Sequence, residues 1–286
     1  MRAEWLLVSV IFLGACGTTP KPVDPPRLKA ALEAESDGAK RYQRGDYAVA
    51  GRRFADAMRQ FAGIDDSIGS TRNRIHLART HLALGRAEAA LELLGAASDG
   101  ATGDIDVLLL RSQALLALMR RSEAEKVLVA AEQSCAAKCP QLPSLKILQA
   151  RAALADGRAA EAQALAGTAI KLLGDKDQAP ETANAWRLTA AARLAAGDAT
   201  GALASAQAAL DIDRRLALPE KIAHDWLLIG NAHRYAMRDQ VPGAAGEAAA
   251  AYSRALDVAH AAGLAEIATL AKQALQDVGA GKIPAK

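Results

Sequence analysis

The chain has 286 residues, of which 51% are hydrophobic, mostly Ala and Leu, and only 3% are aromatic. This composition, with few β-branched runs, favours helix over sheet, so we expect an all-α protein. The formal net charge is +3, from 35 Lys and Arg against 32 Asp and Glu. A balance this small excludes a strongly basic chain of the kind that binds nucleic acid, and we expect no nucleic-acid partner.

Residues 1–15 are expected to be a signal peptide. The apolar run from Trp5 to Leu13 is too short for a membrane span of about 20 residues. It leads into the sequence Leu-Gly-Ala-Cys, ending at Cys16, which is similar to the lipobox of bacterial lipoproteins. This resemblance implies cleavage before Cys16 and lipidation of that cysteine, palmitate included. The alternatives are an uncleaved anchor helix and a chance apolar start.

The residue that follows Cys16 indicates in which membrane the protein is expected to be anchored. In bacterial lipoproteins, Asp at this position commonly signals retention in the inner membrane, whereas this chain has Gly17. The resemblance therefore implies a lipid anchor at the periplasmic face of the outer membrane. Over residues 16–30 we expect an extended tether behind the lipidated cysteine. Four prolines between Gly17 and Arg27 favour polyproline-II geometry there and oppose a helix.

A skeleton of small residues returns six times along the rest of the chain. Each unit has one alanine followed seven residues later by another, and the pairs are Ala50 and Ala57, Ala90 and Ala97, Ala124 and Ala131, Ala162 and Ala169, Ala202 and Ala209, and Ala248 and Ala255. A third small residue comes earlier in each unit: Gly38, Ala78, Ser112, Ala150, Ala190 and, before an insertion, Gly230. Small side chains at fixed spacing indicate helices that pack at very close range.

This pattern resembles the tetratricopeptide repeat (TPR), a helix-turn-helix unit of about 34 residues. The resemblance implies an all-α, TPR-like superhelical solenoid of about six helix-turn-helix repeats over residues 31–262. Behind it, apolar residues at helical spacing predict a capping helix over residues 263–279, which would cover the open flank of the last unit. Residues 280–286 are expected to form a disordered tail.

Glycine marks the turn between the paired helices in four units, at Gly45, Gly85, Gly157 and Gly197. A glycine suits this place because it ends a helix in a left-handed conformation without steric cost. Met119 replaces it in the third unit. In the sixth unit, the segment from Arg238 to Gly246 lengthens the turn by about six residues relative to the family pattern.

Cys135 and Cys139 lie between the third and fourth units and are expected to form a local disulfide in an oxidising compartment. A redox pair and a metal site are the alternatives, but a metal would need two further ligands, and neither His nor Cys is nearby in sequence. The five histidines follow no metal-ligand or catalytic spacing, and no phosphate loop or nucleophile elbow is present. We therefore expect no metal, no cofactor and no catalytic residue.

The first helix of each hairpin lines the inner face of a TPR superhelix and receives extended peptides or partner helices. Transferring that face to this chain gives a candidate partner-binding set: Tyr42, Gln43, Arg72, Arg79, Gln113, Arg151, Asn184, Arg187, Asn231, Arg234 and Tyr235. Guanidinium groups bind carboxylates bidentately and Asn pairs with peptide backbone, so an acidic or extended envelope protein or peptide would suit this face. An ordinary solvated helix face is the alternative.

The resemblance implies a membrane-anchored periplasmic scaffold or adaptor that binds envelope proteins and performs no catalysis. Two related functions share this architecture: a pilotin-like assembly factor for a type IV pilus or secretion machine, and an adaptor for the cell wall or a peptidoglycan enzyme. A direct sugar site would require several aromatic platforms, and only Tyr42 and Tyr235 are available. An enzyme would need catalytic groups assembled from distant units.

Overall fold

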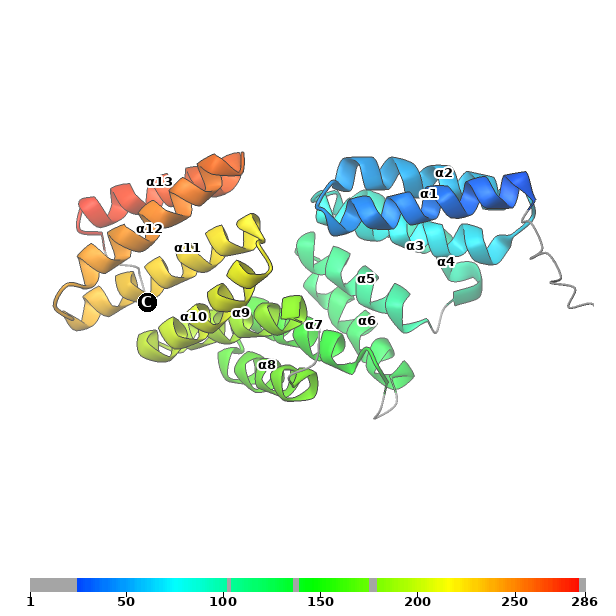
Figure 1. Cartoon of the computed structure of the whole chain (residues 1–286). Helices are drawn as coiled ribbons and strands as arrows, with labels where there is room; N and C mark the ends of the chain where they lie inside the picture. Colours follow the sequence, from blue (N-terminus) through cyan, green and yellow to red (C-terminus); the bar gives the residue numbers. More distant parts are fainter. Residues whose placement is uncertain (1–24, 102–103, 136–138, 175–178, 283–286) are drawn as a thin grey trace, which may run out of the picture.

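The computed structural model describes residues 25–101, 104–135, 139–174 and 179–282. Within these ranges the chain forms thirteen α-helices, one 3₁₀ helix and no strand (Figure 1). The elements are α1 (Pro26–Gln43), α2 (Tyr47–Ala62), α3 (Ser67–Ala83), α4 (Ala87–Ala101), α5 (Ile105–Ala117), α6 (Arg121–Ser134), α7 (Leu142–Ala155), α8 (Ala159–Leu173), α9 (Ala179–Ala195), α10 (Ala199–Arg215), α11 (Pro219–Ala236), η1 (Met237–Asp239), α12 (Ala244–Ala261) and α13 (Ala265–Gly279).

Consecutive helices pair as six hairpins, from hairpin 1 (α1 and α2) to hairpin 6 (α11 and α12), and each hairpin packs on the next. Helix α13 closes the array by burying Ile267, Ala271 and Val278 against the last hairpin. The predicted all-α, TPR-like solenoid with a capping helix is therefore confirmed. Figure 1 shows an arch, in which α1–α4 and α11–α13 form two arms joined by α5–α10.

The small residues of the repeat lie where helices touch. In the first position of each pair, the alanine is fully buried in all six hairpins: Ala50, Ala90, Ala124, Ala162, Ala202 and Ala248. The glycines of the skeleton face aromatic rings, so that a Cβ atom on Gly38 would lie 2.8 Å from the ring of Phe54 and one on Gly230 would overlap Tyr252. The skeleton is thus a packing requirement rather than a bias of composition.

The turns follow the expected chemistry. Gly45, Gly85, Gly157 and Gly197 all have positive φ, between 72° and 86°. Met119 occupies the same place in hairpin 3 and adopts the same left-handed conformation, with φ of 59°. Its side chain is 65% exposed, so little packing offsets the backbone strain.

Three boundaries differ from those expected. Helix α1 begins at Pro26, so residues 26–30 belong to the array and not to the tether, because proline at the first helical position is favourable. The long turn of hairpin 6 spans Met237 to Gly243, and α12 begins at Ala244, earlier than the expected end at Gly246. The end of the chain is held as far as Lys282, whose carbonyl accepts a hydrogen bond from Arg234. Residues 283–286 lie outside the described residues.

The expected signal peptide, the expected lipidation site Cys16 and the expected tether up to residue 24 also lie outside the described part of the chain. Among the described helices, none is both long and apolar enough to cross a membrane. Cys135 and Cys139 are bonded to each other between α6 and α7, with their Cα atoms 5.4 Å apart.

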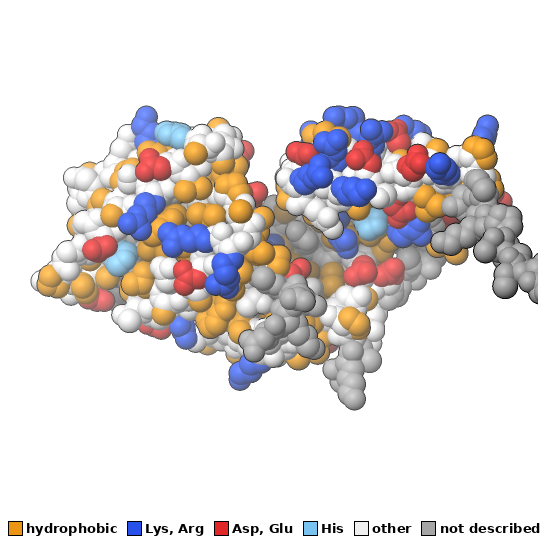
Figure 2. Space-filling model, viewed as in Figure 1, with side chains coloured by type: hydrophobic (Ala, Val, Ile, Leu, Met, Phe, Trp, Pro, Cys, Tyr) orange, Lys and Arg blue, Asp and Glu red, His pale blue; other side chains and the backbone are white. Residues whose placement is uncertain are grey.

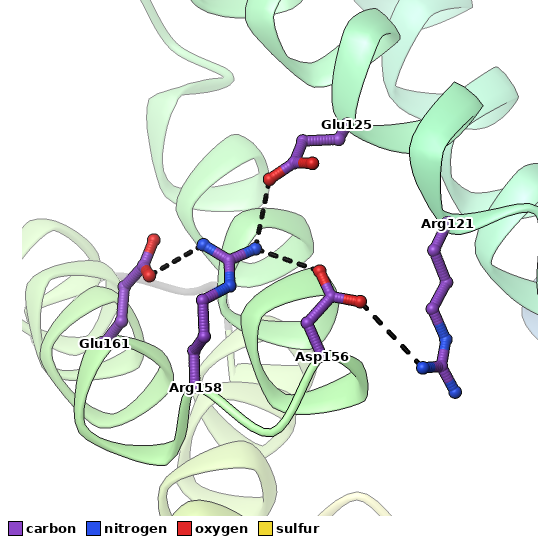
Figure 3. A network of polar contacts seen from close by, with 5 residues as sticks. All are labelled: Arg121, Glu125, Asp156, Arg158 and Glu161. Atoms are coloured by element: carbon purple, nitrogen blue, oxygen red, sulfur yellow. Dashed lines mark hydrogen bonds and ion pairs between the residues drawn. The ribbon is translucent and has the colours of Figure 1, made fainter.

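A surface ion-pair network links hairpins 3 and 4 (Figure 3). Arg158, at the turn of hairpin 4, donates to Glu125 of α6 at 3.1 Å, to Asp156 at 3.0 Å and to Glu161 at 2.7 Å. Arg121 of α6 approaches Asp156 to 3.9 Å. Each exposed pair is weak alone, but together they fix the orientation of α6 relative to the α7–α8 turn.

Replacing Met119 by Gly should stabilise the chain by about 1 kcal/mol, because glycine relieves the positive φ at the cost of some unfolded-state entropy. Denaturant unfolding followed by circular dichroism measures the change. The matched control is Ala164→Gly, an exposed position inside α8, which should destabilise by about 1 kcal/mol. A Met119→Gly variant no more stable than wild type would contradict the strain at this turn.

Candidate binding groove

Two adjoining cavities run along the first helices of the hairpins. The N-terminal cavity, of about 490 Å³, is lined by residues from α1, α3, α5, α7 and α9. The C-terminal cavity, of about 420 Å³, is lined by α7, α9 and α11. Arg151 and Asn184 line both, so the two cavities form one continuous surface, which we call the groove.

The groove combines an apolar floor with a polar rim. The floor of the N-terminal cavity consists of Leu109, Leu110, Ile147 and Leu148, and that of the C-terminal cavity of Leu188, Ala191, Leu227 and Leu228. The rim carries seven members of the candidate partner-binding set: Tyr42, Arg79, Gln113, Arg151, Asn184, Arg187 and Asn231. Apolar contact area with a few placed polar groups is the usual make-up of a binding site.

Arg79 and Arg151 are the cations of the N-terminal cavity. Arg79 is half-buried and Arg151 exposed, and neither has a hydrogen-bond or ion-pair partner within the described ranges. Asp106 and Glu181 also line this cavity, but they form no ion pair with the two arginines. The enclosing walls, and then Arg187, lower the pKa of the Arg151 guanidinium, although its side chain reaches solvent. Two guanidinium groups without a protein partner over an apolar floor would favour a negatively charged ligand.

Arg72 does not line the groove. Its Nε and Nη2 atoms donate to the two carboxylate oxygens of Glu35, at 2.5 and 2.8 Å, and its guanidinium lies over the ring of Phe61. The hydrogen bond from Arg72 lowers the pKa of Glu35. This arginine thus connects α1 and α2 to α3, and its hydrogen-bonding capacity is largely used within the protein.

Three more members of the candidate set lie outside both cavities. Arg234 approaches Asp277 of the capping helix to 3.6 Å, and Tyr235 lies beneath the guanidinium of Arg238. Gln43 is exposed at the end of α1. Arg234 therefore holds the capping helix α13 against hairpin 6. Its partner belongs to the cap, and the first helices of the other hairpins have no cap beside them.

A buried charge cluster lies behind the C-terminal cavity. Asp213 of α10 and Asp225 of α11 are both fully buried, and both accept hydrogen bonds from Nη1 of Arg187, on α9. Nη2 of Arg187 donates to Oδ1 of Asn184 at 2.5 Å, so the cluster reaches the groove rim. Burial raises the pKa of Asp225 to about 7, against the effect of Arg187. The cluster therefore holds more acid than one guanidinium compensates.

Sequence reasoning missed these two carboxylates, although a signal for them exists. Asp213 lies four residues after Ala209, the position that Phe61 and Leu173 occupy in hairpins 1 and 4. Asp225 lies five residues before Gly230, where hairpins 3 and 4 have Val107 and Leu145, both buried. A charged residue at a core position of the repeat is the observation that would have located the cluster.

The two ends of the arch approach each other beside the groove. Burial, and then the carboxylate of Glu220 in α11, raise the pKa of Tyr47 in α2. Tyr47 in turn packs against Tyr42, with ring centroids 5.1 Å apart. Tyr47 of hairpin 1 and Glu220 of hairpin 6 thus lie within electrostatic range of each other.

No metal centre is formed by the described residues, where no three His, Cys, Asp or Glu side chains come together. The groove presents two cations without a protein partner among the described residues, Asn side chains and an apolar floor.

Comparisons with known proteins identify the fold. The chain matches no family model and no curated protein sequence. Among solved structures it is similar to TTC0263, a thermophilic TPR protein of Thermus thermophilus, with a TM-score of 0.53 and 23% identity over 66% of this chain and 97% of that chain. It is also similar to a Rap protein complexed with Competence and Sporulation Factor, with a TM-score of 0.64 and 10% identity over 90% of this chain and 77% of that chain. It is similar as well to the apo form of RapI, with a TM-score of 0.61 and 11% identity over 88% of this chain and 71% of that chain.

These likenesses are below 25% identity and concern the architecture alone. They agree with the six hairpins and the close packing described above. The chain is an all-α solenoid of TPR-like hairpins.

The different placement of two arginines leads to a prediction. Replacing Arg72 by Ala should lower the unfolding free energy by about 1 kcal/mol, because Glu35 loses its partner and Phe61 loses a packing contact. Arg79→Ala should change it by less than about 0.5 kcal/mol, because that side chain has no protein partner to lose. Urea unfolding of both variants tests this, and equal losses would contradict the different environments of the two residues.

Proposed function

We propose that this protein is a non-catalytic interaction scaffold that holds an extended, acidic segment of an envelope protein in its groove. The observation that carries the proposal is the pair Arg79 and Arg151, two cations without a protein partner among the described residues, beside an apolar floor. A carboxylate would neutralise either arginine and gain charge-assisted hydrogen bonds.

The shape of the groove supports an extended segment rather than a compact surface. The groove is continuous along the first helices of successive hairpins, from Tyr42 of α1 to Asn231 of α11, so an elongated ligand could follow it. Asn184 and Asn231 each use Oδ1 within the protein, accepting from Arg187 and from the Tyr252 hydroxyl. Their Nδ2 groups are then the donors left to bind carbonyl oxygens of a partner backbone.

We further propose that lipidated Cys16 anchors the scaffold at the periplasmic face of the outer membrane, behind a proline-rich tether. The lipobox-like sequence and Gly17 support this location. A tether of this kind would hold the groove away from the bilayer while limiting where its partner is met. The assembly of an envelope machine is the setting in which such a scaffold would act.

The groove proposal is tested with a labelled peptide, Ser-Glu-Leu-Asp-Leu with a free carboxyl end, whose amide counterpart Ser-Gln-Leu-Asn-Leu-NH₂ carries no negative charge. The acidic peptide should bind, and the double variant Arg79→Ala with Arg151→Ala should weaken binding about tenfold or more, because two charge-assisted contacts are lost. Fluorescence anisotropy measures both affinities.

The matched control removes two arginines outside the groove. Arg44 and Arg52 belong to hairpin 1, over which Lys and Arg side chains gather in Figure 2, and both are exposed. Their double alanine variant should bind as wild type does. Equal weakening by the two double variants would mean that net charge, rather than the groove, attracts the peptide.

The anchor is tested separately by replacing Cys16 with Ala in the full chain expressed with radiolabelled palmitate. Wild type should incorporate the label and sediment with outer membranes, whereas Cys16→Ala should do neither, since acyl chains are the proposed attachment. Radiolabel retained by the variant would contradict lipidation at Cys16 and would leave the groove proposal unchanged.

A further inference from the structure

We propose that Asp213 and Asp225 form a proton-operated lock that fixes Arg187 and Asn184 at the groove rim and thereby controls the affinity of the groove for acidic segments. This inference rests on the proposed function, because it concerns the regulation of the same groove. The two aspartates act through Arg187, and are therefore positioning residues rather than ligand contacts.

The geometry shows an excess of buried acid. Asp213 and Asp225 are each 0% exposed, and the one guanidinium between them, that of Arg187, donates to both. Oδ1 of Asp213 and Oδ2 of Asp225 are buried and lack a hydrogen-bond partner within the described ranges. A buried oxygen without a partner is costly, and two in one cluster require a donor that the cluster lacks when both acids are ionised.

One proton supplies that donor. Asp213 Oδ2 and Asp225 Oδ1 both accept from the same atom, Nη1 of Arg187, so the two carboxyl groups lie side by side. If Asp225 is protonated, its hydroxyl can donate to Asp213, and the cluster then contains one anion, one cation and one neutral acid. Burial raises the pKa of Asp225 to about 7, so this proton is lost near neutral pH.

The surrounding charges come from every helix packed around the cluster. Arg187 on α9 and Asp213 on α10 act on Asp225 directly, and Arg151 of α7 faces Arg187. Next to Asp225, Lys221 and Glu220 of α11 act on His224, and Arg214 of α10 and Arg254 of α12 lie over the ring of Trp226 at 5.1 and 4.6 Å.

His224, on α11 beside Asp225, is the other group that could titrate near neutral pH. Its pKa is lowered by burial and then by Lys221, and Glu220 and Arg187 also act on it. His224 also lines the C-terminal cavity, so a His224 variant is compared with itself at two pH values, which separates its titration from its contact with the ligand.

Loss of the proton from Asp225 has two consequences at the groove. The cluster gains a negative charge behind the C-terminal cavity, which opposes an anionic ligand. The second carboxylate also competes for Arg187, weakening its hydrogen bond to Asn184 and freeing that side chain from its position on the rim. Both effects lower affinity for an acidic segment as pH rises through about 7.

The protonation of Asp225 affects folding stability in the same direction as it affects affinity, so both fall as pH rises. A carboxyl with a folded-state pKa of about 7, above its ordinary value of 3.8, binds its proton more tightly in the folded chain than in the unfolded one. This contribution to stability is fully present below about 3.8 and is lost as pH rises to about 7. Asp225→Asn keeps a donor for Asp213 and should remove this part of the pH dependence.

The binding test uses the full chain and the acetylated peptide Ser-Glu-Leu-Asp-Leu at pH 6.0 and pH 8.5. Wild type should bind about fivefold more weakly at the higher pH, the size expected of one charge acting across a partly screened distance. Asp225→Asn should bind equally at both pH values, close to the wild-type affinity at the lower one. His224→Asn should retain the wild-type difference.

A second measurement needs no ligand. The chain has three asparagines, Asn73, Asn184 and Asn231, so selective ¹⁵N-Asn labelling gives three side-chain amide signals. The Asn184 signal should shift between pH 6.0 and pH 8.5 in wild type and remain in place in Asp225→Asn, where the one additional signal belongs to position 225. Asn73, in hairpin 2, serves as the internal reference in both proteins.

The outcomes separate the two proposals. Binding that is independent of pH in wild type, or equally dependent on pH in Asp225→Asn, overturns the lock and leaves the groove standing. Absence of peptide binding at either pH counts against the proposed function, and the Asn184 signal then decides the lock alone. An Asn184 signal that shifts equally in both proteins overturns it.

Discussion

The close approach of helices at small residues is the constraint on which the rest of this structure depends. Ala50 and its five equivalents are fully buried, and Gly38 and Gly230 leave room for aromatic rings that no Cβ atom would tolerate. Helices packed this closely stack with little freedom, so each first helix presents the same side to the interior of the arch. The groove is therefore a consequence of the repeat skeleton, although none of its polar residues belongs to that skeleton.

The sequence predicted the repeated helices and turns, but it could not predict which partners the long side chains contact. The fold and the hairpin turns followed from the periodic pattern, and the resemblance to the tetratricopeptide repeat supplied seven residues that line the groove. Arg72 occupies a first-helix position as Arg79 does, but it reaches Glu35, thirty-seven residues earlier, across a hairpin boundary. Spacing within one helix carries no information about such a contact. The boundary at Pro26 was missed for another reason: proline opposes a helix interior but favours its first turn.

The same periodicity makes exceptions visible. Hydrophobic side chains at the Asp213 and Asp225 positions would pack as they do in other hairpins, and would avoid the desolvation of two carboxylates. A buried pair of carboxyl groups around one arginine thus stabilises the fold less than hydrophobic side chains at the same positions would. It joins three helices through a single guanidinium and reaches the groove through Asn184. This position is consistent with a role of the cluster in the groove and not in the stability of the core.

The two halves of the groove therefore differ in how their charge is balanced. In the N-terminal cavity, Arg79 and Arg151 have no acidic partner within hydrogen-bonding distance among the described residues, so a negative group on the ligand would complete the site. In the C-terminal cavity, Arg187 and Lys221 are each already paired with carboxylates of the protein, and the rim presents amide donors beside them. A segment lying along the groove would thus place its acidic groups towards hairpins 2 to 4 and its backbone carbonyls towards hairpins 5 and 6. A segment with its acidic groups at one end would therefore bind in one direction, which the regular repeat alone could not impose.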